Sequence, residues 1–412
     1  MTPPAMSPLY RKIALRLLPF LMLLYMVAFL DRVNISFAAL TMNRDLGISE
    51  SLYGFAAGIF FLGYCLFEVP ANLMLARVGA RRWIAILMVL WGIASVGTAF
   101  VSSKPEYVGA RFLLGVAESG FFPGVVFYLT MWLPRPLRAR LMALFFVAIP
   151  ISSCVGSPIS SHILLMDHIS GLKGWQWLFV IEGAPAIVLG AMSWFLLEDG
   201  PRTAVWLSAA ERDQLARDLA SDEDTSHTGS ASAWLHVARN SAAYFMTSVG
   251  IYGLGFWLPR ILVATGTTAT ATGWWATLPY GAGVAAMLAV SRWRAGLWVR
   301  VMMLLSAAGF VAVGLSHRLP VTLLGFAMAA VGIFGAMPLF WSVATSRVSG
   351  KAMGAAIAII NSVGAVGAFT GPAAMGWLRD ATRSYSAGLF GIAGCLVVGA
   401  VVVSSGTEPS QK

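Results

Sequence analysis

Apolar runs of about 20 residues recur along the whole chain, and this feature constrains the fold most. A helix of about 20 apolar residues crosses the hydrocarbon core of a bilayer, where every backbone polar group has to be paired within the structure. The chain has 412 residues, of which 58% are hydrophobic and 11% are charged, whereas soluble domains carry about 25% charged residues. The sequence therefore predicts an all-α integral membrane protein. We expect twelve spans, at 14–39, 51–76, 82–102, 106–131, 139–164, 175–197, 236–260, 268–291, 297–316, 319–345, 352–377 and 384–405.

The placement of basic residues predicts the orientation of these spans. With the N-terminus inside, 19 of the 28 Lys and Arg residues fall in segments on the cytoplasmic side and seven on the outer side, which leaves Arg32 and Arg111 within the membrane. Cytoplasmic loops of membrane proteins are enriched in Lys and Arg. We therefore expect both termini in the cytoplasm. The net charge of +10 is explained by topology, so we do not expect a nucleic acid as partner.

One long polar stretch divides the chain into two sets of six spans. We interpret 1–197 as an N-terminal six-helix bundle, 198–233 as a cytoplasmic linker and 234–412 as a C-terminal six-helix bundle. Within the linker, Ser208-Ala-Ala-Glu211 fits a capping box that would start a short helix through about Ala220. The sequence SDEDTSHTGSAS that follows is typical of a flexible tether.

Glycine and proline recur at matching places in the two sets of spans. Gly120-Phe-Phe-Pro123 in the fourth span resembles Gly335-Ala-Met-Pro338 in the tenth. A further pair of prolines within spans follows 35 and 34 residues later, at Pro158 and Pro372. This pattern predicts two pseudo-symmetric bundles with a binding site between them. Because Gly and Pro are common in membrane helices, coincidence is the alternative.

Four acids lie within predicted spans, and all belong to the first half: Asp31, Glu68, Glu118 and Glu182. A charge at the bilayer centre costs about 2.5–3.5 kcal/mol on insertion scales. These acids therefore indicate a polar cavity or a proton path lined by the first half. For Glu68 and Glu182 we favour structural hydrogen bonding over a role in transport.

Two of the acids can meet two arginines. Arg111 and Glu118 are seven residues apart and share one helix face, so they and the pair Asp31–Arg32 can be presented to one central volume. Adjacent helical residues diverge by about 100°, so Asp31 and Arg32 point at different targets. One of them is expected to face the cavity and the other a neighbouring helix. The alternative is an ion-pair network that only locks two helices together.

The second half offers aromatic and amide groups instead of charges. Tyr252, Phe256 and Trp257 recur at helical spacing in the seventh span, and Trp341 and Asn361 lie in the tenth and eleventh. Each of these residues could equally serve packing. They are candidates for the far wall of a binding site.

Motifs of enzyme chemistry are missing from the sequence. It contains no HExxH, no GxSxG and no GxxxxGK[ST], which are signatures of zinc proteases, hydrolases and nucleotide-binding proteins. The three cysteines, Cys65, Cys154 and Cys395, all lie in predicted spans and suggest no disulfide or metal cluster. We expect neither an enzyme nor a bound cofactor or metal.

Five stretches carry a resemblance to a known family. They are LDRVNIS at 30–36, GYCLFEVPANLMLARVGARRW at 63–83, ARFLLGVAESGFFPGVVFYLTMWLP at 110–134, GWQWLFVIEGAPA at 174–186 and YGLGFWLPRI at 252–261. The chain resembles the major facilitator superfamily, and within it the anion:cation symporter family of tartrate, phthalate and sugar-acid permeases. It departs from the superfamily pattern after the eighth span, where SRWRAGLWVR lacks Asp-Arg-x-Gly.

The resemblance implies proton-driven import of a small organic anion by alternating access, in a monomer of the bacterial inner membrane. The proton is then the coupling ion. It implies that Asp31 and Glu118 carry protons and that Arg32 and Arg111 meet the substrate carboxylate. The further substrate contacts that we assign are Tyr64, Asn34, Tyr252, Trp341 and Asn361.

Two other functions stay open at this point. A proton-coupled exporter would carry a Gly-rich run ending in Gly-Pro-Gly-Gly in the fifth span, where this chain has only Cys154-Val-Gly-Ser-Pro158. A membrane sensor with a transporter fold would bind the ligand without moving it. The absence of basic residues near the middle of the second half's spans favours a carboxylate over a phosphate ester as ligand.

Overall fold

The structure is a computed structural model that describes residues 6–220, 231–290, 295–347 and 350–404. Within these ranges the chain forms α-helices α1 to α16 and one 3-10 turn, with no strand. The first half contains α1 (Pro8–Val33), α2 (Ile35–Asp45), α3 (Glu50–Val78), α4 (Ala80–Thr98), α5 (Lys104–Glu118), α6 (Phe121–Thr130), α7 (Arg135–Phe146), α8 (Ala148–Ile163), the turn Ile169–Gly171 and α9 (Gly174–Leu196). After α10 (Ala209–Ala220), the second half contains α11 (Ala231–Ala264), α12 (Ala269–Ala289), α13 (Ala295–Leu315), α14 (Leu319–Ala344), α15 (Gly350–Thr382) and α16 (Ser386–Val402).

Local sequence signals explain where several helices begin and end. The hydroxyls of Ser49, Ser103 and Thr268 each accept a hydrogen bond from a backbone N–H in the first turn of the helix that follows, as N-cap residues do. Gly79 separates α3 from α4 with a φ of 87°, a conformation that glycine adopts at little cost. Short polar caps thus divide an apolar chain into separate spans.

Three of the expected spans consist of two consecutive helices. The boundaries fall at Asn34 between α1 and α2, at Ser119–Gly120 between α5 and α6, and at Val147 between α7 and α8. With each pair taken as one span, the twelve expected spans all have a helical counterpart. The first boundary is at Asn34, which is itself a predicted site residue, and the second directly follows the predicted site residue Glu118. The backbone keeps right-handed helical φ and ψ values at these boundaries, −56° and −29° at Asn34, so each span continues as a helix.

Ten segments are long and apolar enough to cross a membrane by length and composition. The two other counterparts of expected spans are α16, which has 17 residues, and α12, which has 21 residues. The Thr, Gly, Trp, Pro and Tyr residues of α12 lower its hydropathy. It packs against α8 and α14, while Trp274 and Leu278 are exposed.

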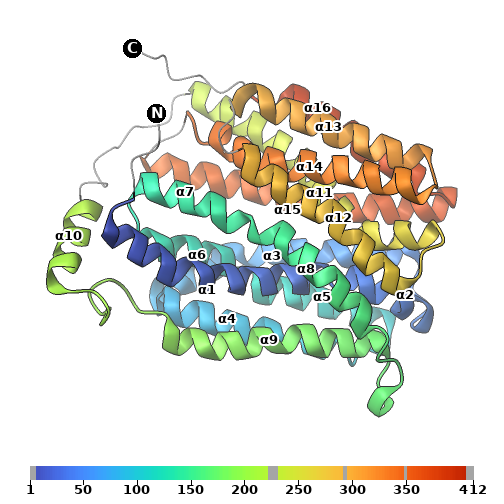
Figure 1. Cartoon of the computed structure of the whole chain (residues 1–412), viewed down its shortest axis with the longest axis horizontal. Coiled ribbons are helices and arrows are strands. Elements are labelled where there is room, and N and C mark those ends of the chain that lie inside the picture. Colours follow the sequence, from blue (N-terminus) through green and yellow to red (C-terminus); the bar gives the residue numbers. More distant parts are fainter. Residues whose placement is uncertain (1–5, 221–230, 291–294, 348–349, 405–412) are drawn as a thin grey trace.

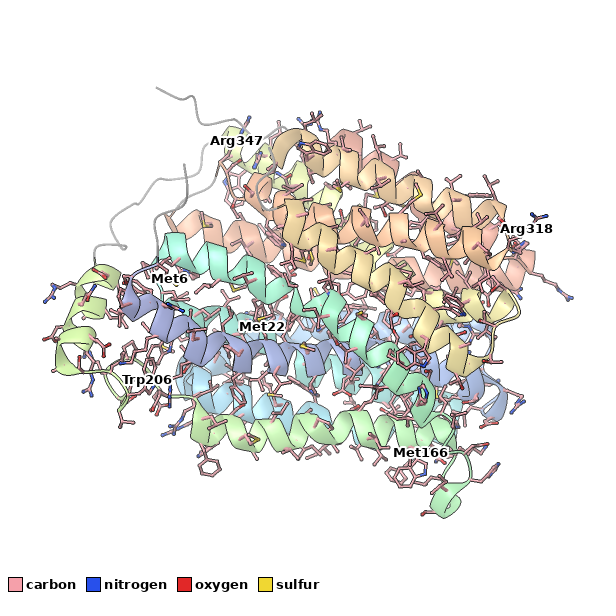
Figure 2. The ribbon with its side chains drawn as sticks, in the orientation of Figure 1. Met6, Met22, Met166, Trp206, Arg318 and Arg347 are labelled. Atoms are coloured by element: carbon pink, nitrogen blue, oxygen red, sulfur yellow. The ribbon has the colours of Figure 1, made fainter. Side chains whose placement is uncertain are left out.

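The two halves lie side by side, with α1 to α9 below and α11 to α16 above in Figure 1. Figure 2 places Trp206 and Arg347 at one end of the helices and Met166 and Arg318 at the opposite end. The sequence assigns the first two to the cytoplasmic side and the last two to the outer side. We use the term outer end for the end that carries Met166 and Arg318.

The halves approach closely where glycines of α3 and α15 meet. A Cβ atom on Gly54 would lie 2.2 Å from the Pro372 carbonyl oxygen, and one on Gly376 would lie 2.2 Å from the Glu50 carbonyl oxygen. Both positions are in the outer halves of their helices. Small residues allow backbones to pack this closely in membrane proteins. This contact between α3 and α15 holds the outer ends of the two halves together.

Polar contacts reinforce the same end. The Tyr53 hydroxyl donates to the Phe256 carbonyl oxygen at 2.7 Å. Ser51 donates from its backbone N–H at 2.7 Å and from its hydroxyl at 2.5 Å to the Asp380 carboxylate. Arg260 forms an ion pair with Glu50. We call these interactions between the halves the outer-end contacts.

The helix α10 is attached to the first half. The reciprocal hydrogen bonds of the Ser208–Glu211 capping box are present at 2.8 and 3.2 Å. Lys12 pairs with Glu211 at 2.9 Å and lowers the pKa of this exposed carboxyl. Trp206, labelled in Figure 2, stacks on Trp132 with ring centroids 5.3 Å apart. The predicted tether lies largely outside the described residues.

Candidate functional site: a central cavity

A cavity of about 70 Å³ lies between the two halves. Its wall is mainly aromatic, with Tyr25, Phe29 and Tyr64 from the first half and Tyr244, Tyr252 and Trp341 from the second. Among the described residues that line it, Arg32 is the one charged side chain. The site is therefore a largely apolar chamber with a single fixed positive group, which is the usual design of a small-molecule site.

Arg32 is held in place by contacts from both halves. One Nη atom forms an ion pair with Glu118, and the other donates to the Tyr252 hydroxyl at 3.2 Å. The guanidinium carbon also lies 5.1 Å from the ring centroid of Phe60 and 5.6 Å from that of Tyr64. Cations attract aromatic faces at such distances. These rings exclude water, which strengthens any charge interaction that Arg32 makes.

Glu118 is the last residue of α5 and is 1% exposed. Its Oε1 atom contacts Arg32, and its Oε2 atom has no hydrogen-bond partner among the described residues. A buried carboxylate oxygen without a donor is unfavourable. Glu118 thus neutralises the cavity arginine at a cost in unsatisfied hydrogen bonding.

Asp31 points away from the cavity, toward α4. Its carboxylate accepts hydrogen bonds from the Ser95 hydroxyl at 2.8 Å, from the Trp91 indole N–H at 3.1 Å and from the Asn34 amide at 3.5 Å. Asp31 and Arg32 therefore point at different targets, as their helical separation requires. Arg32 faces the cavity and Asp31 faces the neighbouring helix.

Arg111 lies behind the cavity and is fully buried, at 0% exposed. Its Nη2 atom donates to the backbone carbonyl oxygen of Arg32 at 3.2 Å, two residues before the boundary between α1 and α2. Its Nε and Nη1 atoms have no partner among the described residues. In this structure Arg111 positions the backbone of Arg32 and does not line the cavity, so its predicted contact with substrate stays a prediction.

Of the other predicted substrate contacts, four line the cavity and one does not. Tyr64, Tyr252, Trp341 and Asn361 line the cavity. Asn34 does not, because its amide turns toward Asp31. Their roles in binding stay predictions.

Two other predicted lining residues, Phe256 and Trp257, lie beside the outer-end contacts instead. The Phe256 carbonyl oxygen accepts from Tyr53, and the Trp257 ring meets the Tyr53 ring edge-on with centroids 5.2 Å apart. Neither Phe256 nor Trp257 lines the cavity. These two aromatic residues close the outer end.

Glu68 joins the halves on the other side of the cavity. Its Oε1 atom accepts a hydrogen bond from the Asn361 amide at 3.2 Å. This is the structural hydrogen bonding that the sequence favoured for Glu68. Because Asn361 also lines the cavity, this contact lies next to the site.

Sequence reasoning missed two tyrosines of the cavity wall, Tyr25 and Tyr244. Tyr25 is seven residues before Arg32 and Tyr244 is eight before Tyr252, so each lies on nearly the same helix face as a predicted site residue. Extending that spacing by two turns would have found both. No group of three side chains suited to a metal ion occurs in the described residues.

The structure thus places a cavity between two helical halves whose outer ends are in contact. The chain belongs to the Major Facilitator Superfamily, whose family model matches residues 21–372. It is a multi-pass membrane protein that transports small organic substrates.

Similar proteins include transporters of different named substrates. The chain is 45% identical to a putative tartrate transporter of Agrobacterium vitis over 97% of its own length and 95% of the relative's. It is 35% identical to a quinolone resistance transporter of Acinetobacter baumannii over 95% and 93% of the two chains. A partially occluded, inward-open structure of the xylose transporter XylE from E. coli matches with a TM-score of 0.78 and 15% identity, over 97% of this chain and 99% of that one. At that identity the structural likeness concerns the fold alone.

Proposed function

We propose that this chain is a proton-coupled symporter that imports a small organic carboxylate. The observation that carries the proposal is the single guanidinium of the cavity, which is paired with a buried carboxyl group of the protein itself. A guanidinium binds a carboxylate through two parallel hydrogen bonds. The carboxylate of a substrate and that of Glu118 therefore compete for the same partner.

This competition supplies a mechanism for coupling. When a substrate carboxylate takes the place of Glu118 on Arg32, the acid loses its counter-charge in a site of low dielectric. A buried carboxylate without a cation is far less stable than the neutral acid, so Glu118 takes up a proton as the anion binds. Release of that proton to the cytoplasm restores the Arg32–Glu118 pair and expels the substrate. The charge within the cavity is the same before and after binding.

The remaining wall favours a hydroxylated or aromatic acid. Tyr252, Tyr64 and Asn361 offer hydrogen-bonding groups beside the apolar rings. A tartrate-like dicarboxylate, a sugar acid or an aromatic acid can each place one carboxylate on Arg32 and its remainder against this wall. The relative named as a putative tartrate transporter supports the first class. A thermal-shift screen of organic acids would identify the class, and tight binding of sugar phosphates would contradict the proposal.

Export is the second candidate function, because a relative at 35% identity is named for quinolone resistance. Import and export move the substrate in opposite directions under the same proton gradient. An importer accumulates substrate in proteoliposomes when the outside is acidic, whereas an exporter depletes it under the same gradient. The guanidinium of the cavity favours molecules that carry a carboxylate over purely cationic ones.

Replacing Glu118 by glutamine tests the coupling. The amide keeps the shape of the side chain but cannot carry a proton, so we expect substrate exchange to continue and accumulation driven by a pH gradient to fall to the background level. Both are measured in proteoliposomes, the first by counterflow and the second by uptake at pH 5.5 outside and 7.5 inside. Glu106→Gln is the matched control, because Glu106 lies on the same helix as Glu118 but at its opposite end. There its carboxylate accepts a hydrogen bond from the Ser102 backbone N–H. Retention of wild-type accumulation by Glu118→Gln would exclude Glu118 as the coupling residue.

A further inference from the structure

The outer-end contacts include one cation, Arg260 of α11, whose side chain reaches across to the first half. One Nη atom donates to the Ala39 carbonyl oxygen of α2 at 3.0 Å, and the other forms an ion pair with Glu50 of α3. The guanidinium carbon lies 5.1 Å from the ring centroid of Tyr53. All three partners belong to the first half, so Arg260 loses them together if the outer ends separate.

The ion pair between Arg260 and Glu50 is incompletely bonded. The two side chains are 12% and 20% exposed. In the part of the chain that the structure describes, the Nε atom of Arg260 and the Oε2 atom of Glu50 are buried without a hydrogen-bond partner. A guanidinium and a carboxylate in full register form two parallel hydrogen bonds. A ligand carboxylate that binds Arg260 through both oxygens is therefore a stronger partner than Glu50 is in this geometry.

Arg260 lies in the same row of α11 as the cavity residue Tyr252. Tyr252, Phe256 and Arg260 follow one another at intervals of four residues, which places them along one ridge of the helix surface. The rings of Tyr252 and Phe256 both face Phe61 of α3, with centroids 4.3 and 6.3 Å away. Arg260 lies about 12 Å outward from Tyr252 along the helix axis. The row thus leads from the outer end to the hydroxyl that contacts Arg32.

Two other cations near the outer end keep their partners if the halves separate. Lys173 pairs with Asp45 at 3.2 Å, and both residues belong to the first half. Arg379 stacks on the Tyr385 ring at 4.8 Å, and both residues belong to the second half. Arg260, in contrast, is left without its anion when α3 and α11 move apart.

We propose that Arg260 is a second carboxylate-binding site, at the outer end, which captures the incoming organic anion in exchange for Glu50. The inference rests on the proposed function, since it gives the imported carboxylate a first contact before it reaches Arg32. When the outer end opens, Glu50 stays with α3 and the guanidinium faces the space between the halves. A substrate carboxylate binds it there and then moves inward past Phe256 and Tyr252. Because the anion binds the separated halves better than the closed ones, it favours the open outer end.

Two variants that break the same ion pair separate capture of the anion from bridging of the halves. Arg260→Gln removes the guanidinium, whereas Glu50→Gln removes only its competitor. We expect Arg260→Gln to raise the outside substrate concentration at half-maximal counterflow about fivefold, the upper value for an exposed charge pair, and to weaken its dependence on salt. We expect Glu50→Gln to lower that concentration and to keep the salt dependence. A bridge without a role in capture would give both variants the same effect, so equal effects would overturn the inference.

Arg260→Lys decides the matter if Arg260→Gln does not assemble. The ammonium group keeps the charge but not the two parallel hydrogen bonds. We therefore expect the salt dependence of wild type together with a half-maximal concentration about two- to threefold higher, and a half-maximal concentration equal to that of wild type would overturn the inference. Counterflow needs no proton gradient. If wild type exchanges the carboxylate but does not accumulate it under a pH gradient, the proposed function fails while the result for Arg260 stands.

Discussion

Replacing Arg32 by lysine is expected to lower the affinity for the substrate anion by at least about 30-fold. Disruption of a buried, hydrogen-bonded charge pair costs about 2–5 kcal/mol, and about 30-fold corresponds to the lower end of that range. Lysine keeps the positive charge that neutralises Glu118, so the protein should still assemble. It cannot form two parallel hydrogen bonds to a carboxylate, and its shorter reach loses the contact with the Tyr252 hydroxyl. The measurement is the substrate concentration at half-maximal uptake, compared with binding by thermal shift.

Tyr252→Phe is the matched variant for this comparison. It removes one hydrogen bond to Arg32 but leaves the guanidinium and the aromatic wall in place, so we expect a loss of at most about tenfold, the value of one hydrogen bond. If Arg32→Lys transported the anion as well as wild type, the cavity arginine would not be the carboxylate site. Among the described residues, Arg111 would then be the other buried guanidinium available for that role.

Replacing Gly54 by leucine is expected to abolish closure of the outer end and to reduce transport at least about tenfold. The added Cβ would lie 2.2 Å from the Pro372 carbonyl oxygen, well inside van der Waals contact, and this neighbour is backbone that cannot turn aside. Overpacking of this kind costs about 1–3 kcal/mol or more. It disfavours the closed outer end relative to an open one, and a transporter held in one state does not cycle.

Cys154 can report the change. It lies on α8 at the interface between the halves, with its sulfur 3.7 Å from the Thr277 carbonyl oxygen of α12. In a background without Cys65 and Cys395, we expect Gly54→Leu to increase labelling of Cys154 by a membrane-impermeant maleimide added outside. Gly391→Leu is the control, because a Cβ at Gly391 meets no atom within 4 Å. Equal labelling in Gly54→Leu and wild type would contradict the assignment of the closed end.

The outer-end contacts and the cavity together suggest how one half moves against the other. Ser51, Tyr53 and Glu50 lie in the first turn of α3 and bind partners on α11 and α15, so they have to separate if the outer end opens. Arg32, by contrast, has partners in both halves at the cavity itself. Binding of an anion there can therefore change the contact between the halves through Tyr252.

Much of the fold could be predicted from the sequence because membrane insertion acts on single segments. Each apolar run is long enough to span by itself, and the cost of a charge in the bilayer belongs to the residue that carries it. The helical spans and the presence of Asp31, Arg32, Arg111 and Glu118 inside them are visible in this way, and all four side chains are buried. Of the cavity residues, Trp341 and Asn361 were candidates from their residue type and place in the spans, whereas Tyr64 needed the family resemblance in addition.

The sequence by itself determined that this chain spans a membrane many times, in two sets of spans with a buried charge cluster in the first, since hydropathy and charge are properties of each segment alone. Only the tertiary structure decided that Arg32 faces the cavity while Asp31 turns to Ser95 and Trp91, and that Arg111 holds a backbone oxygen. It also decided which end is closed. These features depend on the rotation of each helix about its axis and on contacts between residues hundreds of positions apart, which packing sets and local sequence does not.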